Sequence, residues 1–148
     1  MKSHFKLHHL GYATANIDTS LVFFLNLGFN LESKLIYDDL RGINIQFIKI
    51  PSTDILVELI SPNMEKPENS KGANIHQLLT SLNRMINTRA GLYHFGFELL
   101  SNDFNPKDFG LRKITSRAPA IALNNRDVEF YLQNDGSIVE IIYPEEHI

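Results

Sequence analysis

Two carboxylates occupy matching places in two apolar segments of this sequence. Glu140 is the only charged residue in the run S-I-V-E-I-I-Y, and Glu58 has the same place in I-L-V-E-L-I-S-P, so the pattern V-E-(L/I)-I-x-P occurs twice. An ionised carboxylate is costly to bury by itself in an apolar layer. Each glutamate therefore requires a partner, a raised pKa or a bound metal ion.

Two histidines repeat in the same way. The segment L-H-H-L-G-Y contains His9 and the segment L-Y-H-F-G-F contains His94, and both follow the pattern L-x-H-Φ-G-aromatic, where Φ is apolar. The offset between the histidines is close to the offset between the glutamates. The pattern predicts two copies of one unit, each of which opens with a histidine-bearing strand and closes with a glutamate-bearing strand.

This inventory of two imidazoles and two carboxylates predicts a site for a divalent metal ion. It suits five- or six-coordinate Zn²⁺, Co²⁺, Ni²⁺, Mn²⁺ or Fe²⁺, with water or substrate in the remaining positions. Such an ion acts as a Lewis acid toward a carbonyl or enediolate oxygen. A single strand histidine is more often a core residue, and a single glutamate in V-E-L-I can face solvent. The joint recurrence of all four favours the metal site over these structural readings.

The remaining polar residues are given simpler interpretations. His8 has the opposite strand parity to His9 and is read as structural. Asp38 and Asp39 read as turn residues, and Arg41 as solvated surface. Arg126 is the best candidate among the arginines to meet an anionic ligand.

The first unit reads as β-α-β-β-β. Apolar alternation predicts its strands and helical periodicity predicts its helix, with Gly28 as the stop. In the first strand, His9 is expected on the face of Phe5 and Leu7. The expected strands cover residues 5–13, 31–37, 43–50 and 55–61, and the helix, capped by Asn16 or Asp18, runs to about Leu27.

The second unit repeats this order with a weaker helix. A polar loop over 62–71 and a helix over 74–87 bridge the two units. The expected strands then cover 92–100, 111–116, 127–133 and 137–143, with an extended stretch over 119–123 and a short helical stub within 101–110. The fold class is therefore α+β, with two βαβββ modules that form a cupped mixed sheet and a reduced second helix. We expect a single domain over 1–148, with module 1 at about 5–61, the bridging loop and helix at 62–89 and module 2 at about 90–144.

Composition narrows the function classes. The chain has 148 residues, a net charge of −3 and no cysteine. No basic block is present, which argues against nucleic-acid binding, and the lack of cysteine removes thiolate chemistry. The N-terminus lacks the apolar run of a signal peptide, and no stretch approaches the about 18 apolar residues of a membrane span. We expect a cytoplasmic protein with no membrane partner.

The motifs resemble those of the vicinal oxygen chelate superfamily, which includes lactoylglutathione lyase, methylmalonyl-CoA epimerase, extradiol dioxygenases and antibiotic-resistance proteins. The opening H-H-L-G-Y-A-T-A-N-I-D-T-S-L-V-F-F-L-N-L-G-F is similar to the first strand and helix of that family. The segment G-L-Y-H-F-G-F-E-L and the run S-R-A-P-A-I-A-L-N-N-R are similar to segments of its epimerase branch. The resemblance implies the cupped fold and, as metal ligands, His9, Glu58, His94 and Glu140.

The epimerase resemblance implies proton transfer next to the carbonyl of an acyl-CoA or another thioester. Glu140 is the residue expected to move the proton. The third strand offers Asn44 and Gln46 but no second carboxylate, so these two and Arg126 are the candidates for substrate binding. The resemblance also implies a homodimer.

Three alternatives stay open. A lactoylglutathione lyase usually carries an arginine where Ala13 and Thr14 stand. An extradiol dioxygenase usually has two histidines and one glutamate, and here a second glutamate is present. A non-catalytic binding member generally lacks the ligand set.

Overall fold

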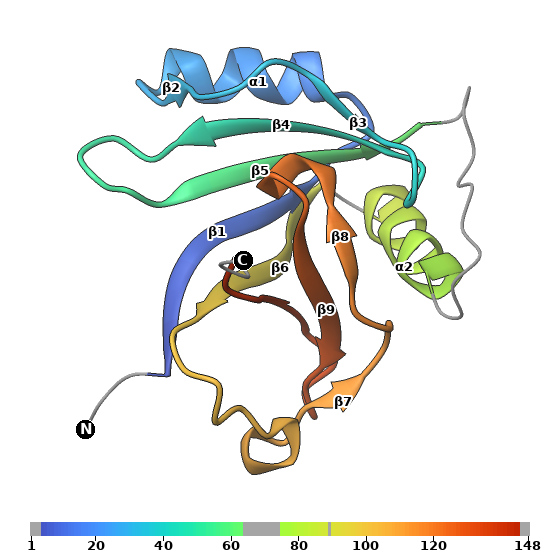
Figure 1. The fold of residues 1–148 in the computed structure, drawn as a ribbon. Helices are drawn as coiled ribbons and strands as arrows, with labels where there is room; N and C mark the ends of the chain where they lie inside the picture. Colours follow the sequence, from blue (N-terminus) through green and yellow to red (C-terminus); the bar gives the residue numbers. More distant parts are fainter. Residues whose placement is uncertain (1–3, 64–74, 89, 146–148) are drawn as a thin grey trace.

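The computed structural model describes residues 4–63, 75–88 and 90–145. In this described part of the chain, ten strands form one mixed sheet in the order β2-β4-β5-β1-β6-β10-β9-β7, with β3 paired to β4 and β8 paired to β9. The sheet curls from the β4 edge to the β9 edge, and α1 lies across the outside of β4 (Figure 1). The predicted α+β class with a cupped mixed sheet is confirmed.

The first module follows its predicted element order, except that one predicted strand is divided into two. Asn16 caps α1, because its side chain accepts a hydrogen bond of 3.0 Å from the backbone N–H of Thr19. This side-chain acceptor replaces one of the partners that a helix start lacks. The elements are β1 (Phe5–Ala13), α1 (Ile17–Asn26), β2 (Asn30–Leu31), β3 (Ile36–Asp38), β4 (Ile43–Lys49) and β5 (Leu56–Pro62).

The single strand predicted over 31–37 is wrong, because the structure divides it into β2 and β3. Both pieces pair with β4, at opposite ends. Between them, the backbone N–H groups of Glu32 and Ser33 both donate to the carbonyl oxygen of Phe47, at 3.0 and 3.3 Å. Two residues thus face one residue of β4, which is the arrangement of a β-bulge and breaks the regular ladder.

The bridging helix and the second module follow. The predicted polar loop over 62–71 falls mostly outside the described residues. Leu82 of the bridging helix is buried and packs with Ala13 and Ile60. The elements are α2 (Ile75–Thr88), β6 (Gly91–Leu99), the 3-10 helix η1 (Pro106–Phe109), β7 (Arg112–Lys113), β8 (Ala118–Ala120), the 3-10 helix η2 (Ile121–Leu123), β9 (Arg126–Leu132) and β10 (Ile138–Ile142).

Two predicted segments of the second module differ from the structure. The strand predicted over 111–116 shortens to β7, and the stretch 119–123, predicted as extended, ends in the helical turn η2. The turn is closed by Asn124 and Asn125, whose φ angles of 56° and 61° lie in the left-handed region that asparagine tolerates. The reduced helix is present as η1.

The two modules join through β1 and β6, which run antiparallel. On either side, β5 runs parallel to β1 and β10 runs parallel to β6. This symmetric order places the histidine strands at the centre of the sheet and each glutamate strand directly beside one of them.

The two faces of the sheet bury different clusters. The concave face carries Ile45, Phe47, Phe130, Ile138 and Ile142. The outer face of module 1 packs against α1 through a cluster of Ile17, Ile48, Val57 and Leu59. Burial of each such side chain contributes roughly 1.5–3 kcal/mol.

The outer face of module 2 is covered by aromatic rings. Phe5 packs there with Val139 and Ile141, and its ring lies 5.6 Å from that of Phe104 and 5.0 Å from that of Phe109. These rings cover the face that corresponds to the α1 side of module 1, which explains how a short η1 suffices. Because Phe5 lies on this outer face, the expectation that it shares a face with His9 is wrong. A register shift between Leu7 and His9 reverses the parity.

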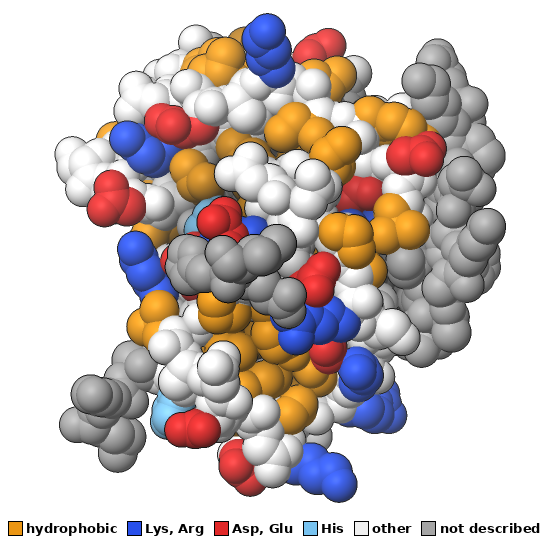
Figure 2. All heavy atoms as spheres, in the orientation of Figure 1, with side chains coloured by type: hydrophobic (Ala, Val, Ile, Leu, Met, Phe, Trp, Pro, Cys, Tyr) orange, Lys and Arg blue, Asp and Glu red, His pale blue; other side chains and the backbone are white. Residues whose placement is uncertain are grey.

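Exposed apolar side chains occur in the α1 region. Val22, Phe23 and Leu27 of the α1 region are 57–59% exposed. Figure 2 shows hydrophobic side chains scattered among polar ones along this upper side of the molecule. In the described residues, every helix is too short or too polar to cross a membrane.

Candidate metal centre

Four side chains converge in the middle of the concave face. They are His9, Glu58, His94 and Glu140, and one ligand atom of each lies within 4.8 Å of those of the other three. All four residues are buried, with exposures between 0% and 5%. They come from β1, β5, β6 and β10 of one chain, so the cluster closes without a second subunit.

The distances suit ligands that share one ion. Oε2 of Glu140 lies 2.9 Å from Nε2 of His9 and 3.0 Å from Nε2 of His94, and the two Nε2 atoms are 3.0 Å apart. Oxygens of Glu58 lie 3.7 Å from His9 and 3.9 Å from His94. Ligand atoms at right angles around an ion, with bonds of about 2.1 Å, lie about 3 Å apart. The donor set and its spacing therefore fit a divalent ion.

Glycine makes room for each imidazole. In the β1–β6 ladder, Gly11 is the partner of His94 and Gly96 is the partner of His9. A Cβ built on Gly11 would lie 2.8 Å from Cγ of His94, inside the contact distance of real side chains. In the motif L-x-H-Φ-G, the glycine lies two residues after one histidine. Its backbone packs directly against the imidazole of the other histidine.

The two carboxyl groups differ in their proton affinity. Burial raises the pKa of Glu58 to about 7, and the nearby Glu140 adds to this rise. Burial acts in the same direction on Glu140, but His9 and His94 outweigh it through charge and hydrogen bonding and lower the pKa of that carboxyl. In the metal-free protein, Glu140 is therefore the ionised partner of the imidazoles.

A second layer holds the imidazoles. Nδ1 of His8 lies 2.9 Å from Nδ1 of His9, on the ring side away from the cluster. Rings of Phe47 and Phe130 stand edge-on to His9 and His94, with centroids 6.2 and 5.8 Å apart. His8, interpreted from the sequence as structural, thus contacts a member of the site. Strand parity in the sequence could not predict this contact, because the register shift between Leu7 and His9 changes the direction in which the side chains point.

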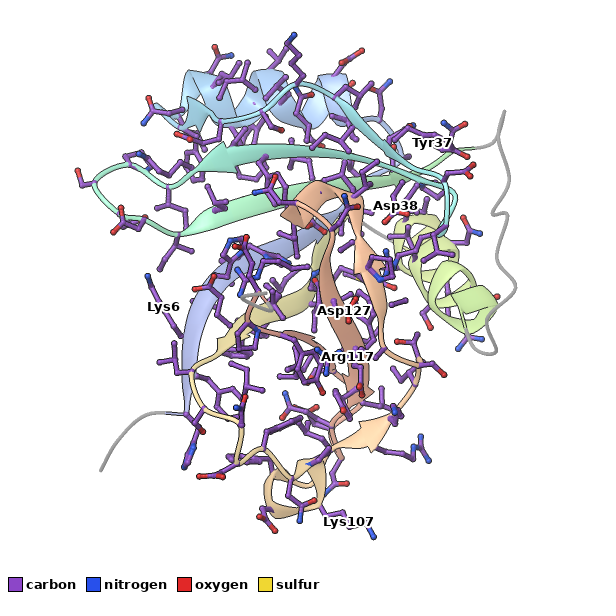
Figure 3. All side chains as sticks on the ribbon, in the orientation of Figure 1. Lys6, Tyr37, Asp38, Lys107, Arg117 and Asp127 are labelled. Carbon is purple, nitrogen blue, oxygen red and sulfur yellow. The ribbon has the colours of Figure 1, made fainter. Side chains whose placement is uncertain are left out.

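A small cavity with a volume of about 40 Å³ lies beside the cluster. Its wall includes Asp38 and Arg41, which the sequence suggested as turn and surface residues but which are 3% and 7% exposed. Asp38 lies at the end of β3 (Figure 3). The other lining residues are Ile43, Ile45, Glu58, Ile60, Leu82, Tyr93, His94, Ala120, Ala122, Leu123, Phe130 and Glu140.

The three predicted substrate-binding residues lie outside this lining. Asn44 accepts a hydrogen bond of 3.0 Å from Asn63, and the Gln46 amide donates to the carbonyl oxygen of Ser33. Arg126 donates to Glu98 and to the carbonyl oxygen of Tyr143, at 2.7 and 3.0 Å. Their role in substrate binding stays a prediction.

Comparison with known proteins identifies the fold. No family model and no curated protein sequence matches the chain. A hypothetical protein from Bacillus halodurans C-125 matches in structure with a TM-score of 0.71 at 21% identity over 99% of both chains. Methylmalonyl-CoA epimerase from Mycobacterium tuberculosis has a TM-score of 0.68 at 20% identity, over 95% of this chain and 88% of its own.

A third match is a variant of Streptomyces coelicolor methylmalonyl-CoA epimerase in complex with 2-nitronate-propionyl-CoA. Its TM-score is 0.67 at 19% identity, over 97% of this chain and 100% of its own. The TM-scores of these three matches establish the fold, and identities of 19–21% do not establish the reaction. The chain has the fold of the vicinal oxygen chelate superfamily, to which methylmalonyl-CoA epimerases belong.

Proposed function

We propose that the protein is a metal-dependent isomerase that moves a proton next to the carbonyl of a thioester such as an acyl-CoA. The observation that carries the proposal is the buried convergence of His9, Glu58, His94 and Glu140 beside a cavity. Four donors of this kind, desolvated together, are costly to a fold unless a ligand compensates them. Support also comes from a similar structure, a methylmalonyl-CoA epimerase in complex with methylmalonyl-CoA.

The four side chains would hold the ion through two ring nitrogens and two carboxylates. When bound, the ion supplies a Lewis acid that stabilises negative charge developing on a carbonyl oxygen. Glu140 is the proposed proton-transfer residue, because its carboxylate lies at the cluster and also lines the cavity. Most side chains that line the cavity are apolar, and a low local dielectric constant strengthens each electrostatic contact inside it.

The minimal reaction is exchange of the substrate's α-proton with solvent. Asp38, the further carboxylate in the cavity wall, is held by Arg41 at 2.8 Å and is less available as a second base. Proton exchange at one face does not need such a base, whereas epimerisation requires proton delivery from both faces.

The test is deuterium uptake in D₂O by a panel of acyl-CoA thioesters that includes methylmalonyl-CoA, with protein loaded with Co²⁺. Uptake is expected in the wild type, and a loss of at least about 100-fold in His94→Ala and Glu140→Gln. His4→Ala is the matched control, because His4 is an exposed histidine that contacts Ser101 away from the site. Absence of exchange across the panel would contradict the proposal, and turnover of a hemithioacetal instead would indicate a lactoylglutathione lyase.

A further inference from the structure

The cavity beside the metal cluster is too small to hold a whole thioester. Its volume of about 40 Å³ is room for about three water molecules, since one water needs roughly 10–15 Å³ by this measure. Glu58, His94 and Glu140 line the cavity, so its space adjoins three of the four expected metal ligands. The reacting end of a substrate can lie there, but the rest of the molecule must lie outside.

A larger groove adjoins this cavity. Its volume of about 500 Å³ is in the range of small-molecule sites, roughly 300–1,000 Å³. Its walls come from α2 through Ser81 and Met85, from the start of β6, and from the connection between β9 and β10 through Ser137. Tyr93 and His94 line both the groove and the cavity.

Other hollows do not reach the metal cluster in this way. Three further hollows in the described part of the chain, on the outer face of module 2 and around Arg117, have no lining residue in common with the cavity. The groove is therefore the hollow from which a ligand can approach the cluster, and the wall shared with the cavity lies across its path.

A β-bulge brings Tyr93 into this shared wall. The ladder partner of Gly11 is His94, and the partner of the next residue, Tyr12, is Leu92. Tyr93 is therefore an extra residue of β6 in its ladder with β1. Neighbouring residues of a regular strand point to opposite faces. The bulge is the physical reason that Tyr93 and His94, although adjacent in the chain, both line the cavity.

The same irregularity has another use in β1. His8 is the extra residue there, at the register shift between Leu7 and His9, and it contacts the His9 imidazole on the side away from the cluster. Tyr93 has the equivalent place in the second L-x-H motif, yet it lies in the wall of the cavity. The two modules thus differ at this position, and only module 2 uses it to shape the ligand space.

The Tyr93 side chain is held by packing on the cavity side. Its ring centroid lies 5.4 Å from that of the His94 imidazole, in an edge-on arrangement. The residue also packs against the clusters that contain Phe130 and Leu82, which both line the cavity. It is half-buried, which fits a side chain with the cavity on one side and the groove on the other.

We propose that the groove is the substrate-entry site of the metal centre and that Tyr93 is the specificity-determining residue between the groove and the cavity. The part of a thioester beyond its reacting carbonyl lies in the groove, and the reacting end passes the Tyr93 side chain. This inference rests on the metal site of the proposed function and adds where the substrate enters and what limits its size. A reacting end with a small substituent fits the cavity, and one with a bulky substituent does not.

The first experiment measures the binding of two chelating probes and needs no turnover. Protein loaded with Co²⁺ and freed of excess metal is titrated with acetohydroxamate, which carries a methyl group, and with benzohydroxamate, which carries a phenyl group. Both bind a metal ion through two oxygen atoms, and the visible absorption of Co²⁺ reports the binding. The wild type is expected to bind acetohydroxamate at least about tenfold more tightly, because the phenyl group exceeds the cavity.

Variants of Tyr93 test its part in this preference. In Tyr93→Ala the cavity and the groove become continuous, and the preference is expected to fall below about threefold. Tyr93→Phe is the matched control, which keeps the ring and is expected to keep the preference. A tenfold preference retained in Tyr93→Ala overturns the inference, and so does a wild type without any preference.

The second experiment tests the route by rapid mixing. Ser137 lines the groove and not the cavity, so Ser137→Trp places a large side chain on the path alone. This variant is expected to slow the association of both hydroxamates by at least about tenfold and to keep the wild-type affinity for Co²⁺. Asn102→Trp is the control, because Asn102 is exposed and lines a hollow apart from the cavity. Association as fast in Ser137→Trp as in Asn102→Trp overturns the groove as the entry site.

Further measurements separate the possible failures. If Tyr93→Ala does not fold, Tyr93→Leu keeps an apolar side chain in the wall without the ring and carries the same expectation. If the wild type binds no Co²⁺, the proposed function and this inference fail together. If Co²⁺ binds but no thioester exchanges its α-proton, only the proposed reaction fails, because the hydroxamates judge the groove and Tyr93 without turnover.

Discussion

Gly96 lies directly opposite His9 in the β1–β6 ladder, and a Cβ added to Gly96 would lie 2.6 Å from Nδ1 of that imidazole. The backbone of one module is thus the support for the ring of the other. Gly11 and His94 have the same relationship with the modules exchanged.

Substitution of this glycine is expected to displace the ring. Gly96→Ala should weaken Co²⁺ binding by at least about tenfold and lower the free energy of unfolding by roughly 1–3 kcal/mol, because an added methyl group overpacks the site. Calorimetric titration and urea unfolding measure the two effects. Gly136→Ala is the control, since its φ of 89° makes alanine strained while its Cβ meets no atom within 4 Å. It should lose stability and keep metal affinity. Equal metal affinity in Gly96→Ala and wild type would contradict the role of Gly96.

His8 is expected to act through His9. When Nε2 of His9 holds a metal ion, its Nδ1–H is left to donate to Nδ1 of His8, 2.9 Å away. Loss of such an outer partner typically weakens metal affinity by about 10–100-fold. His8→Ala should show this loss in competition with a chelating dye, while His4→Ala should not. The prediction fails if the two variants bind metal alike.

The stability of the metal-free protein is expected to depend on pH through Glu58. Its pKa is raised in the folded protein from 4.5 to about 7, mainly by burial. The stability that this group contributes is therefore full below pH 4.5 and is lost as the pH rises through about 7. The side chain in Glu58→Gln stays neutral at every pH. The free energy of unfolding of this variant relative to the wild type should therefore increase from pH 5 to pH 8, by on the order of 1–3 kcal/mol.

Urea unfolding with a chelator present measures this difference. Glu140→Gln is the contrasting variant, since the pKa of Glu140 is lowered by His9 and His94 against the effect of burial. The stability that the ionised Glu140 contributes is present above pH 4.5 and is lost as the pH falls. Glu140→Gln should therefore lower the free energy of unfolding most near neutral pH. Parallel pH profiles for wild type and Glu58→Gln would be inconsistent with a raised pKa.

Metal loading is expected to stabilise the fold. A ligand that binds only the folded state at 100 times its Kd adds about 2.7 kcal/mol. Co²⁺ should therefore raise the Tm of the wild type by several degrees, and removal of the ion by a chelator should reverse the shift. In His94→Ala, which removes one of the four converging donors, the shift should shrink or vanish. An identical shift in the variant would place the ion elsewhere on the chain.

The sequence alone determined the two-module architecture and the four converging residues. The duplicated motifs L-x-H-Φ-G and V-E-(L/I)-I-x-P are local patterns, and their repetition fixes which strands correspond. Once two such units pair about a twofold relationship, His9, Glu58, His94 and Glu140 must meet, because all four project from the same face of central strands.

Only the tertiary structure decided what surrounds that cluster. His8 reaches His9 because a register shift turns β1, and the identity of the residues does not encode where a ladder slips. Arg41 and Asp38 enter the cavity because the end of β3 folds against the second module, where the Pro119 carbonyl oxygen receives the guanidinium. A charged turn and a charged cavity wall look alike in sequence, since burial depends on contacts between segments far apart along the chain.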